Sequence, residues 1–323
     1  MAPLAAALVV AGTLTGCSGE VLDDRVRVAG SESLRSYLSA ASGVFLTEQT
    51  SAEVRLELTG TGDGLTSLCD GLVDLAAASR PMNERERRAC EQSGVEPVEL
   101  PVALDAVAVV TAADTGPNCL TPAQLYAAAG PESTGVVDWR TAQLLALGVE
   151  PTTPPLAQAD AGAPLGVIAP RAGSGTVDTF LTFAVEPVAE ARGNSTELRA
   201  DVVTSPSSGL TITEAIAGPA QLGIVGFAEL ATTDERARAV AVDVGGTCVA
   251  PSATTIADGT YPIQRELVLY VDRTVAATNP TAARLVDLIT SDQGQEIAER
   301  VGVVRLPADR LAETRSAWTP ISS

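Results

Sequence analysis

The 323-residue chain contains neither histidine nor lysine, so all 21 of its basic residues are arginine. Without histidine, a Ser-His-Asp or Cys-His catalytic centre and an imidazole general base are excluded. Without lysine, the chain has no amine for a Schiff base and no lysine for a Walker-type phosphate loop. A zinc site with histidine ligands is also excluded. The chemistry that remains belongs to arginine, hydroxyl groups, backbone amides, carboxylates and a few thiols.

Aromatic residues are also scarce, at 3% of the chain, whereas apolar residues reach 46%. We therefore expect a large core of alanine, valine and leucine, in one large domain or two of ordinary size. The net charge is −19, and the isoelectric point is near 4.3. Such an acidic chain lacks the cations that neutralise nucleic-acid phosphates, so no nucleic-acid partner is expected.

The N-terminus is the one apolar segment that resembles a targeting signal. Residues 3–16 are apolar or small, and this run is too short for a membrane span. The sequence Leu14-Thr15-Gly16-Cys17 resembles a bacterial lipobox, which predicts cleavage before Cys17 and a lipid on its thiol, although no basic residue precedes the apolar run. Residues 1–25 are then a lipoprotein signal peptide and tether, and the protein lies outside the cytoplasm, anchored to the outer face of the membrane. The alternative is an ordinary signal peptide followed by a chance cysteine.

The other four cysteines suggest two disulfides in an exported chain. Cys69 and Cys90 are close in sequence and flank one strand-like segment, so we pair them, which leaves Cys119 with Cys248. Three pairings are possible in principle. A four-thiolate zinc site is the rival interpretation, but no Cys-x-x-Cys spacing supports it, and we expect no metal or cofactor.

Apolar periodicity indicates strands that alternate with helices along the chain. Strands are expected at residues 26–29, 53–58, 73–77, 102–111, 165–169, 222–226 and 266–271, and helices at 34–48, 65–71, 83–92, 121–129, 177–186, 211–217 and 280–300. This rhythm predicts an α/β fold, with a parallel or mixed sheet covered by helices on both faces.

Three segments share one design, in which a strand is followed by glycine, by hydroxyl residues and then by a helix start. They are Gly30-Ser31-Glu32-Ser33-Leu34, Gly60-Thr61-Gly62-Asp63-Gly64 and Gly173-Ser174-Gly175-Thr176. The free amides and the dipole of a helix start form an anion site that needs no lysine. Glycine lets the backbone approach the anion, and Ser or Thr hydroxyls add donors.

Charged residues inside or beside these loops have two interpretations. Arg171 precedes the third loop and offers a bidentate fork for an oxyanion. Glu32 and Asp63 are either solvated charges or acceptors for the proton of a protonated oxyanion, which would favour hydrogen phosphate over sulfate. Any one of the loops alone is most simply a helix cap or turn, so the hypothesis of an anion site depends on all three.

These segments, in this order and spacing, resemble the phosphate-binding proteins of ABC importers, the PstS type. The resemblance covers about residues 26–310. Beyond the three loops it depends on the segments Ala78-Ser79-Arg80-Pro81, Ser174-Gly175-Thr176-x-Asp178, Gly223-Ile224-Val225-Gly226-Phe227, Tyr261-Pro262-Ile263-x-Arg265 and Gly294-Gln295 with Gly302-Val303-Val304. The cysteine positions also resemble a subgroup of this family with two disulfides.

The resemblance implies a periplasmic-binding-protein type II fold, in which two α/β lobes with mixed sheets are joined by two crossover strands. Lobe 1 would comprise residues 26–103 plus 264–318, and lobe 2 residues 104–263. The implied ligand-binding residues are Ser33, Leu34 through its backbone amide, Thr61, Ser79, Arg171, Ser174, Gly175 and Thr176, with Ser31, Glu32, Asp63 and Arg80 as possible secondary contacts.

Two positions depart from the family pattern. Many members carry an aspartate where this chain has Ser79, and Arg171 is one residue closer to Ser174 than is usual. The implied function is capture of inorganic phosphate in the cleft and its delivery to an ABC permease by a monomeric binding protein without enzymatic activity. The alternatives are a binding protein for another tetrahedral oxyanion, a degenerate surface sensor or interaction protein, and a hydrolase that uses a serine nucleophile.

Overall fold

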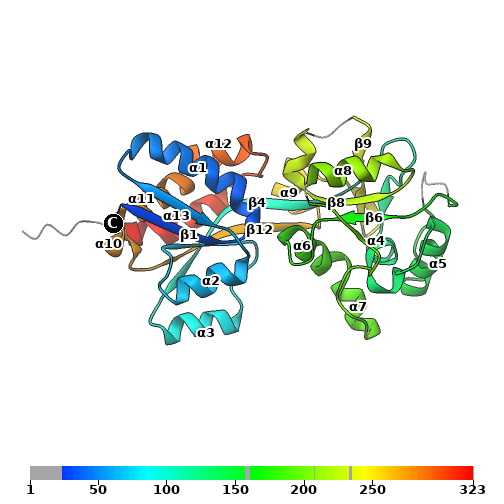
Figure 1. Ribbon diagram of the computed structural model, residues 1–323, viewed down its shortest axis with the longest axis horizontal. Helices are drawn as coiled ribbons and strands as arrows, with labels where there is room; N and C mark the ends of the chain where they lie inside the picture. Colours follow the sequence, from blue (N-terminus) through cyan, green and yellow to red (C-terminus); the bar gives the residue numbers. More distant parts are fainter. Residues whose placement is uncertain (1–23, 157–160, 207, 233–234, 323) are drawn as a thin grey trace, which may run out of the picture.

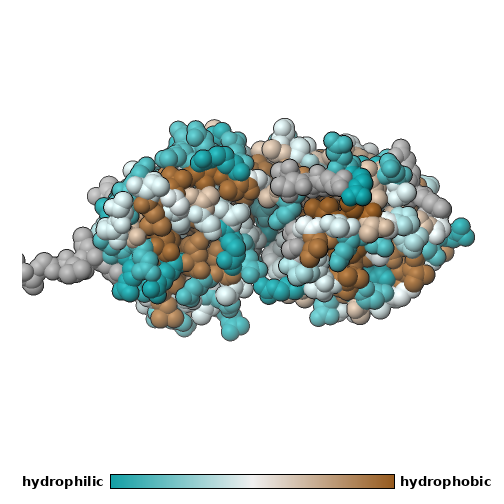
Figure 2. Space-filling model, turned by 45° about the horizontal axis from the view of Figure 1, so that its top comes forward, coloured by the Kyte–Doolittle hydropathy of each residue, from teal (hydrophilic) through white to brown (hydrophobic). Residues whose placement is uncertain are grey.

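The computed structural model describes residues 24–156, 161–206, 208–232 and 235–322. The molecule has two halves that lie side by side, and the strands β4 and β12 run from one half toward the other (Figure 1). The narrowing between the halves is also visible on the surface (Figure 2). The expected signal peptide and Cys17 lie outside the described residues. Within the described residues, no helix combines the length and the apolar character that a membrane span requires.

The first half contains the first and last elements of the described chain and three parallel strands. Strand β1 pairs with β2 on one side and with β3 on the other, and β12 runs antiparallel to β3. The elements are β1 (Arg25–Gly30), the 3-10 helix η1 (Glu32–Leu34), α1 (Arg35–Glu48), β2 (Glu53–Glu57), α2 (Thr61–Cys69), β3 (Leu75–Ala78), α3 (Glu84–Gln92), β12 (Gln264–Asp272), α10 (Val275–Thr278), α11 (Pro280–Thr290), α12 (Asp292–Arg300) and α13 (Ala308–Ser322).

The second half is built from the middle of the chain. Strand β8 pairs in parallel with β6, which pairs in parallel with β7, and a small three-stranded sheet of β11, β10 and β5 lies beside them. The elements are β5 (Cys119–Leu120), α4 (Pro122–Ala129), η2 (Pro131–Ser133), α5 (Trp139–Val149), β6 (Val167–Ala169), α6 (Gly175–Ala184), α7 (Glu186–Arg192), β7 (Val203–Thr204), α8 (Ser208–Ala217), β8 (Leu222–Gly226), η3 (Phe227–Thr232), β9 (Ala237–Ala239), β10 (Ala241–Val244), β11 (Thr247–Val249) and α9 (Ala253–Ala257).

Strand β4 (Pro97–Ala112) belongs to both halves. Its residues 97–106 pair with β12, whereas residues 107–110 pair with β8 and residues 110–112 with β9. Most residues of this 16-residue strand are buried, so both of its faces are covered over most of its length. Nine of the described strands therefore form one sheet in the order β2-β1-β3-β12-β4-β8-β6-β7, with β9 paired to β4 beside this path and a parallel set of strands in each half. This confirms the mixed α/β fold with two lobes.

Each half has its own apolar core. In the first, Tyr37 and Phe45 of α1 pack with β1, β4, β12 and α11, and a smaller cluster under α2 and α3 covers the other face of the sheet. In the second, Trp139 and Phe180 are among the largest buried side chains. Residues Val304, Leu306 and Leu311 follow β12 in sequence, yet they pack into the core of the second half.

Among the expected helices, two differ most from the observed ones. The expected helix 280–300 is two helices, because the chain leaves the helical conformation at Ser291 (φ −78°, ψ 172°), whose hydroxyl oxygen accepts a hydrogen bond from the amide of Gly294 at 3.1 Å. Helix α2 begins at Thr61, four residues earlier than expected, so most of the Gly-rich loop is its first turn. Gly64 permits this, because a Cβ there would lie 2.4 Å from the Cα of Gly30.

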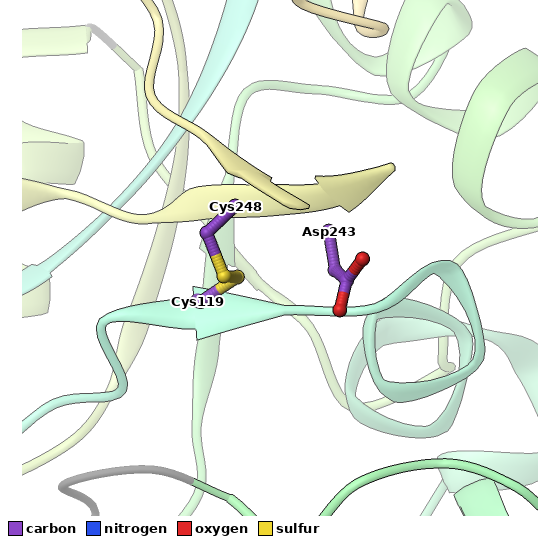
Figure 3. Close-up of side chains that lie close together, drawn as sticks. All are labelled: Cys119, Asp243 and Cys248. Carbon is purple, nitrogen blue, oxygen red and sulfur yellow. A yellow bond between two sulfur atoms is a disulfide. The ribbon is translucent and has the colours of Figure 1, made fainter. Parts of the chain in front are cut away.

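Both expected disulfides are confirmed. Cys69 bonds to Cys90, and Cys119 bonds to Cys248. The second bond joins β5 to β11, with the carboxylate of Asp243 beside it (Figure 3). Since these sulfur atoms are bonded to each other, they are not available as the ligands of the rival zinc site.

Candidate functional site

Two adjoining cavities lie where the halves meet. They have volumes of about 630 and 690 Å³, and both are lined by Glu32, Gly175 and Arg265. The first cavity is bounded by the N-terminal turn of α2 and by the segment that follows β3, and the second by the turns after β1, β6 and β7. All three loops singled out in the sequence therefore reach one interlobe cleft, since residues from each line at least one of the two cavities.

The first loop follows β1 and forms η1 directly. Ser31 caps this turn, because its hydroxyl oxygen accepts from the amide of Ser33 at 3.3 Å. The amide of Leu34 donates to the carbonyl of Ser31 at 3.3 Å, and the Leu34 side chain is fully buried. Ser33 therefore presents its hydroxyl to the cleft, whereas the amide of Leu34 already has an acceptor within its own turn.

The second loop brings Thr61 and Ser79 together. Thr61 is the first residue of α2, and its hydroxyl oxygen accepts from the amide of Ser79 at 3.1 Å. The two hydroxyl oxygens are 3.2 Å apart, and both residues line the first cavity. Asp63 is exposed on the same helix turn and lies outside the linings of both cavities. The first-turn amides of α2 have no intrahelical acceptors, which gives this edge of the cleft its donor character.

Arg80 also lines the first cavity, but its guanidinium already forms an ion pair with a carboxylate. Its two terminal nitrogens donate to Glu86 at 2.8 and 2.7 Å. Glu86 in turn closes a capping box with Asn83 at the start of α3. The hydrogen bonds from Arg80 lower the pKa of the Glu86 carboxyl, and the same contacts raise the pKa of Arg80. Arg80 is thus held as half of an ion pair at the rim of the cavity.

The third loop starts α6 in the second half. Ser174 caps this helix, because its hydroxyl oxygen accepts from the amide of Val177 at 3.3 Å, and Gly175 and Thr176 supply the amides of the first turn. All three expected ligand residues of this loop line the second cavity. The helix dipole adds partial positive charge at this position.

Arg171 lines the second cavity, but its side chain is largely exposed. Its guanidinium contacts Glu32 of the other half at 3.0 Å, and the two side chains are 61% and 42% exposed. Exposed ion pairs of this kind contribute little stability. The expected cation of the site is therefore paired with a carboxylate and surrounded by solvent.

Arg265 was missing from the expected site residues, yet its guanidinium is at the centre of the cleft. It begins β12 opposite Asp105 of β4, and the two side chains are 8% and 11% exposed. Its nitrogens donate to Asp105 at 2.8 Å, to the Ser33 hydroxyl at 2.7 Å, to the Thr179 hydroxyl at 2.5 Å and to the Gly175 carbonyl. The available sequence signals were the segment Tyr261-Pro262-Ile263-x-Arg265 of the family resemblance and the single charge of Asp105 within the apolar run 102–111.

Asp178 places a carboxylate on the wall of the first cavity. It lies in the first turn of α6, and desolvation raises the pKa of its carboxyl despite the opposing influence of Arg265 and Arg80. The cleft therefore combines many donors with four lining arginines (Arg35, Arg80, Arg171 and Arg265) and several carboxylates, of which that of Asp178 is partly desolvated. Such a set suits an oxyanion that carries its own proton better than one that carries none.

Comparisons with known proteins agree with this geometry. A family model described as a PBP superfamily domain matches residues 17–293. The chain belongs to the PBP superfamily. Among curated proteins, SphX of Synechococcus elongatus is 29% identical over 286 residues, which cover 88% of this chain and 78% of SphX. The phosphate-binding protein PstS of Staphylococcus aureus is 21% identical over 297 residues, covering 90% and 81% of the two chains.

Solved structures show the same PBP superfamily fold. A possible phosphate binding protein from Planctomyces limnophilus superposes with a TM-score of 0.70 at 22% identity, covering 93% of this chain and 99% of its own. At this identity the likeness establishes the fold alone. The proteins that this chain resembles are solute-binding proteins and not enzymes.

Proposed function

We propose that the protein captures inorganic phosphate in the interlobe cleft and delivers it to an ABC permease. The observation that carries the proposal is the convergence of three helix-start loops, from both halves of the chain, on one cleft. The proposal is supported by relatives whose names describe phosphate binding and by the PBP superfamily match.

The donors would come from both lobes, taken as residues 26–103 plus 264–318 and residues 104–263. Ser33 and Thr61 would donate hydroxyl hydrogens from lobe 1, with Ser79 beside Thr61. Ser174, Gly175 and Thr176 would donate from the start of α6 in lobe 2. Hydrogen bonds to a charged group contribute about 1.5–3 kcal/mol each. Micromolar affinity requires about 8 kcal/mol in total, so only part of this set is needed.

Hinge closure would couple binding to delivery. A ligand that contacts both lobes favours the closed arrangement, because it has more donors there than in an open one. The permease would then recognise the closed, loaded protein. A lipid on Cys17 would keep the protein at the outer face of the membrane. The protein would act there as a monomer.

Titration calorimetry of the purified protein with phosphate, sulfate and molybdate tests the proposal. Phosphate should bind with micromolar or tighter affinity. Thr176→Ala should weaken phosphate binding, and Thr254→Ala, on α9 and outside both interlobe cavities, is the matched control. A lack of heat with all three anions would refute the proposal. If sulfate or molybdate gave heat of binding and phosphate gave none, the second candidate would be favoured, which is a binding protein for another tetrahedral oxyanion. Position 79 supports this candidate because it holds a serine, Ser79, and no carboxylate.

Lipidation has its own test. Expression of the full chain in a bacterial host with lipoprotein processing should place it in the membrane fraction, and Cys17→Ser should release it. A membrane-bound Cys17→Ser variant would contradict the anchor and would favour an ordinary signal peptide.

A further inference from the structure

A buried cation would strengthen the proposed phosphate site, and the arginines that line the two cavities differ in burial. Arg35 is 53% exposed and lies 3.8 Å from Glu32. Arg171 is 61% exposed and paired with Glu32, and Arg80 is 44% exposed and paired with Glu86. The side chain of Arg265, in contrast, is 8% exposed and lines both interlobe cavities. We infer that Arg265, and not Arg171, is the guanidinium that binds the oxyanion. This inference rests on the proposed function and names the charged group at its site.

The contacts of Arg265 divide its guanidinium into two edges. One edge, Nε and Nη2, is held by the Oδ2 atom of Asp105 at 3.2 and 2.8 Å. Nη2 also reaches the hydroxyl of Ser33 at 2.7 Å, and Nη1 reaches Thr179 and the carbonyl of Gly175. Asp105 fixes the plane of the fork, and the other edge faces residues of both lobes. A planar fork held in this way is suited to bidentate recognition of an oxyanion.

The same edge lies among the donors expected to bind phosphate. A Cβ added to Gly175 would be 2.6 Å from the Ser33 hydroxyl and 2.9 Å from Nη1 of Arg265. The amide end of α6, the η1 hydroxyl and the guanidinium therefore meet within a few ångströms. An anion that accepts hydrogen bonds from the first two would be within reach of the third. Arg171 has no such contact with Ser33 or Gly175 in the described residues.

The buried position also explains how one arginine can serve a protein of charge −19. The guanidinium is already desolvated and oriented by Asp105, so an entering anion replaces only neutral acceptors, namely the hydroxyls of Ser33 and Thr179 and the carbonyl of Gly175. A charge-assisted bond in a site shielded from water is stronger than the same bond at the surface. An exposed pair such as Arg171 with Glu32 gains little from a passing anion, because solvent and salt screen it.

Calorimetry with phosphate on matched variants tests the assignment. Arg265→Gln should lower the affinity at least 100-fold, and Arg171→Gln should change it by less than about 3-fold, since only the first removes a desolvated charge–anion contact. Arg265→Lys keeps the charge without the fork and should give an intermediate loss. Equal losses in both glutamine variants, or a larger loss in Arg171→Gln, would overturn the inference.

A folding defect is the expected complication, because Arg265→Gln leaves the buried carboxylate of Asp105 without its partner. The double variant Asp105→Asn with Arg265→Gln removes both charges and should remain folded by circular dichroism while failing to bind phosphate. Binding by the double variant at parental affinity would overturn the inference. A second readout is rescue: millimolar guanidinium chloride should restore phosphate binding to Arg265→Ala, which a purely structural role of the side chain would not allow.

Phosphate binding by the parent protein distinguishes failure of the proposed function from failure of the Arg265 assignment. If the parent binds none of the three tetrahedral anions, the proposed function fails and the inference fails with it. If the parent binds phosphate and the Arg265 variants bind it equally well, the proposed function stands and only the assignment of Arg265 is refuted.

Discussion

The close approach of α2 to β1 makes Gly64 a sensitive position near the site. A methyl group at position 64 would lie 2.4 Å from the Cα of Gly30, 2.7 Å from the carbonyl oxygen of Ala29 and 2.8 Å from the amide of Gly30. All three are backbone atoms of the strand, so no side chain can move aside. Because ordinary contact begins near 3.4 Å, Gly64→Ala requires α2 to move outward by ~1 Å.

The stability cost follows from two opposing contributions. Overpacking costs about 3 kcal/mol when the neighbours cannot give way. Replacing glycine by alanine inside a helix stabilises the helix by about 1 kcal/mol. The net loss of about 2 kcal/mol corresponds to a melting temperature about 4–8 °C below that of the parent. The same movement would carry Thr61 away from the amide of Ser79, so phosphate affinity should fall as well.

Gly43 on α1 supplies the matched control, because a Cβ there would meet nothing within 4 Å. Gly43→Ala should raise stability by about 0.5–1 kcal/mol through helix propensity alone and should leave phosphate binding unchanged. The assay is thermal unfolding followed by circular dichroism, together with phosphate calorimetry. A Gly64→Ala protein that melts at or above the parental temperature would refute the packing argument.

Three further outcomes are expected. Removing the disulfide between Cys119 and Cys248 with paired alanine substitutions should cost about 5 kcal/mol in denaturant unfolding, since it closes a loop of 129 residues; an unchanged midpoint would contradict this. The hydrogen bonds from buried Arg199 hold the pKa of the Asp201 carboxyl well below its usual range, so this pair stabilises the fold above about pH 4 and the contribution is lost as the pH falls toward the folded pKa. Acid unfolding of Asp201→Asn should accordingly begin from a lower stability and fall less steeply than that of the parent. Asp178→Asn should reduce the ratio of phosphate to sulfate affinity by about 10-fold, because a carboxylate can accept a hydrogen bond from hydrogen phosphate but not from sulfate; an unchanged ratio would exclude this role.

The repeated strand and helix pattern could be predicted from the sequence because each element carries its own apolar period. The expected strand 102–111 lies within β4, and the expected helix 34–48 matches α1 to within one residue at its start. The break at Ser291 was missed because the apolar pattern continues on both sides of it, with Ile289 and Ile297 both buried. Only the local cap at Ser291 and the tight approach of Gly294 to the preceding turn distinguish two helices from one.

The loops of the site were predictable for the same reason, since helix starts are local features. Their convergence was also expected, because the family resemblance supplies the two-lobed topology. The orientation of single side chains was not predictable, and Arg171 is the example. Its position next to the third loop suggested a ligand contact, but the side chain instead reaches Glu32, a residue 139 positions away in sequence.

Arg265 shows what kind of information a single sequence does not contain. The arginine and Asp105 are 160 residues apart. Asp105 is the one charge in the apolar run 102–111, whereas Arg265 stands next to Glu266 near the start of β12. Either charge alone is compatible with an exposed strand end. Only the antiparallel register of β4 with β12 places the two opposite each other, and only burial makes an unpaired charge there too costly to retain. Once the register is known, the pairing of the two charges follows, and the guanidinium edge that contacts Ser33, Thr179 and Gly175 faces the cleft because Asp105 holds the other edge.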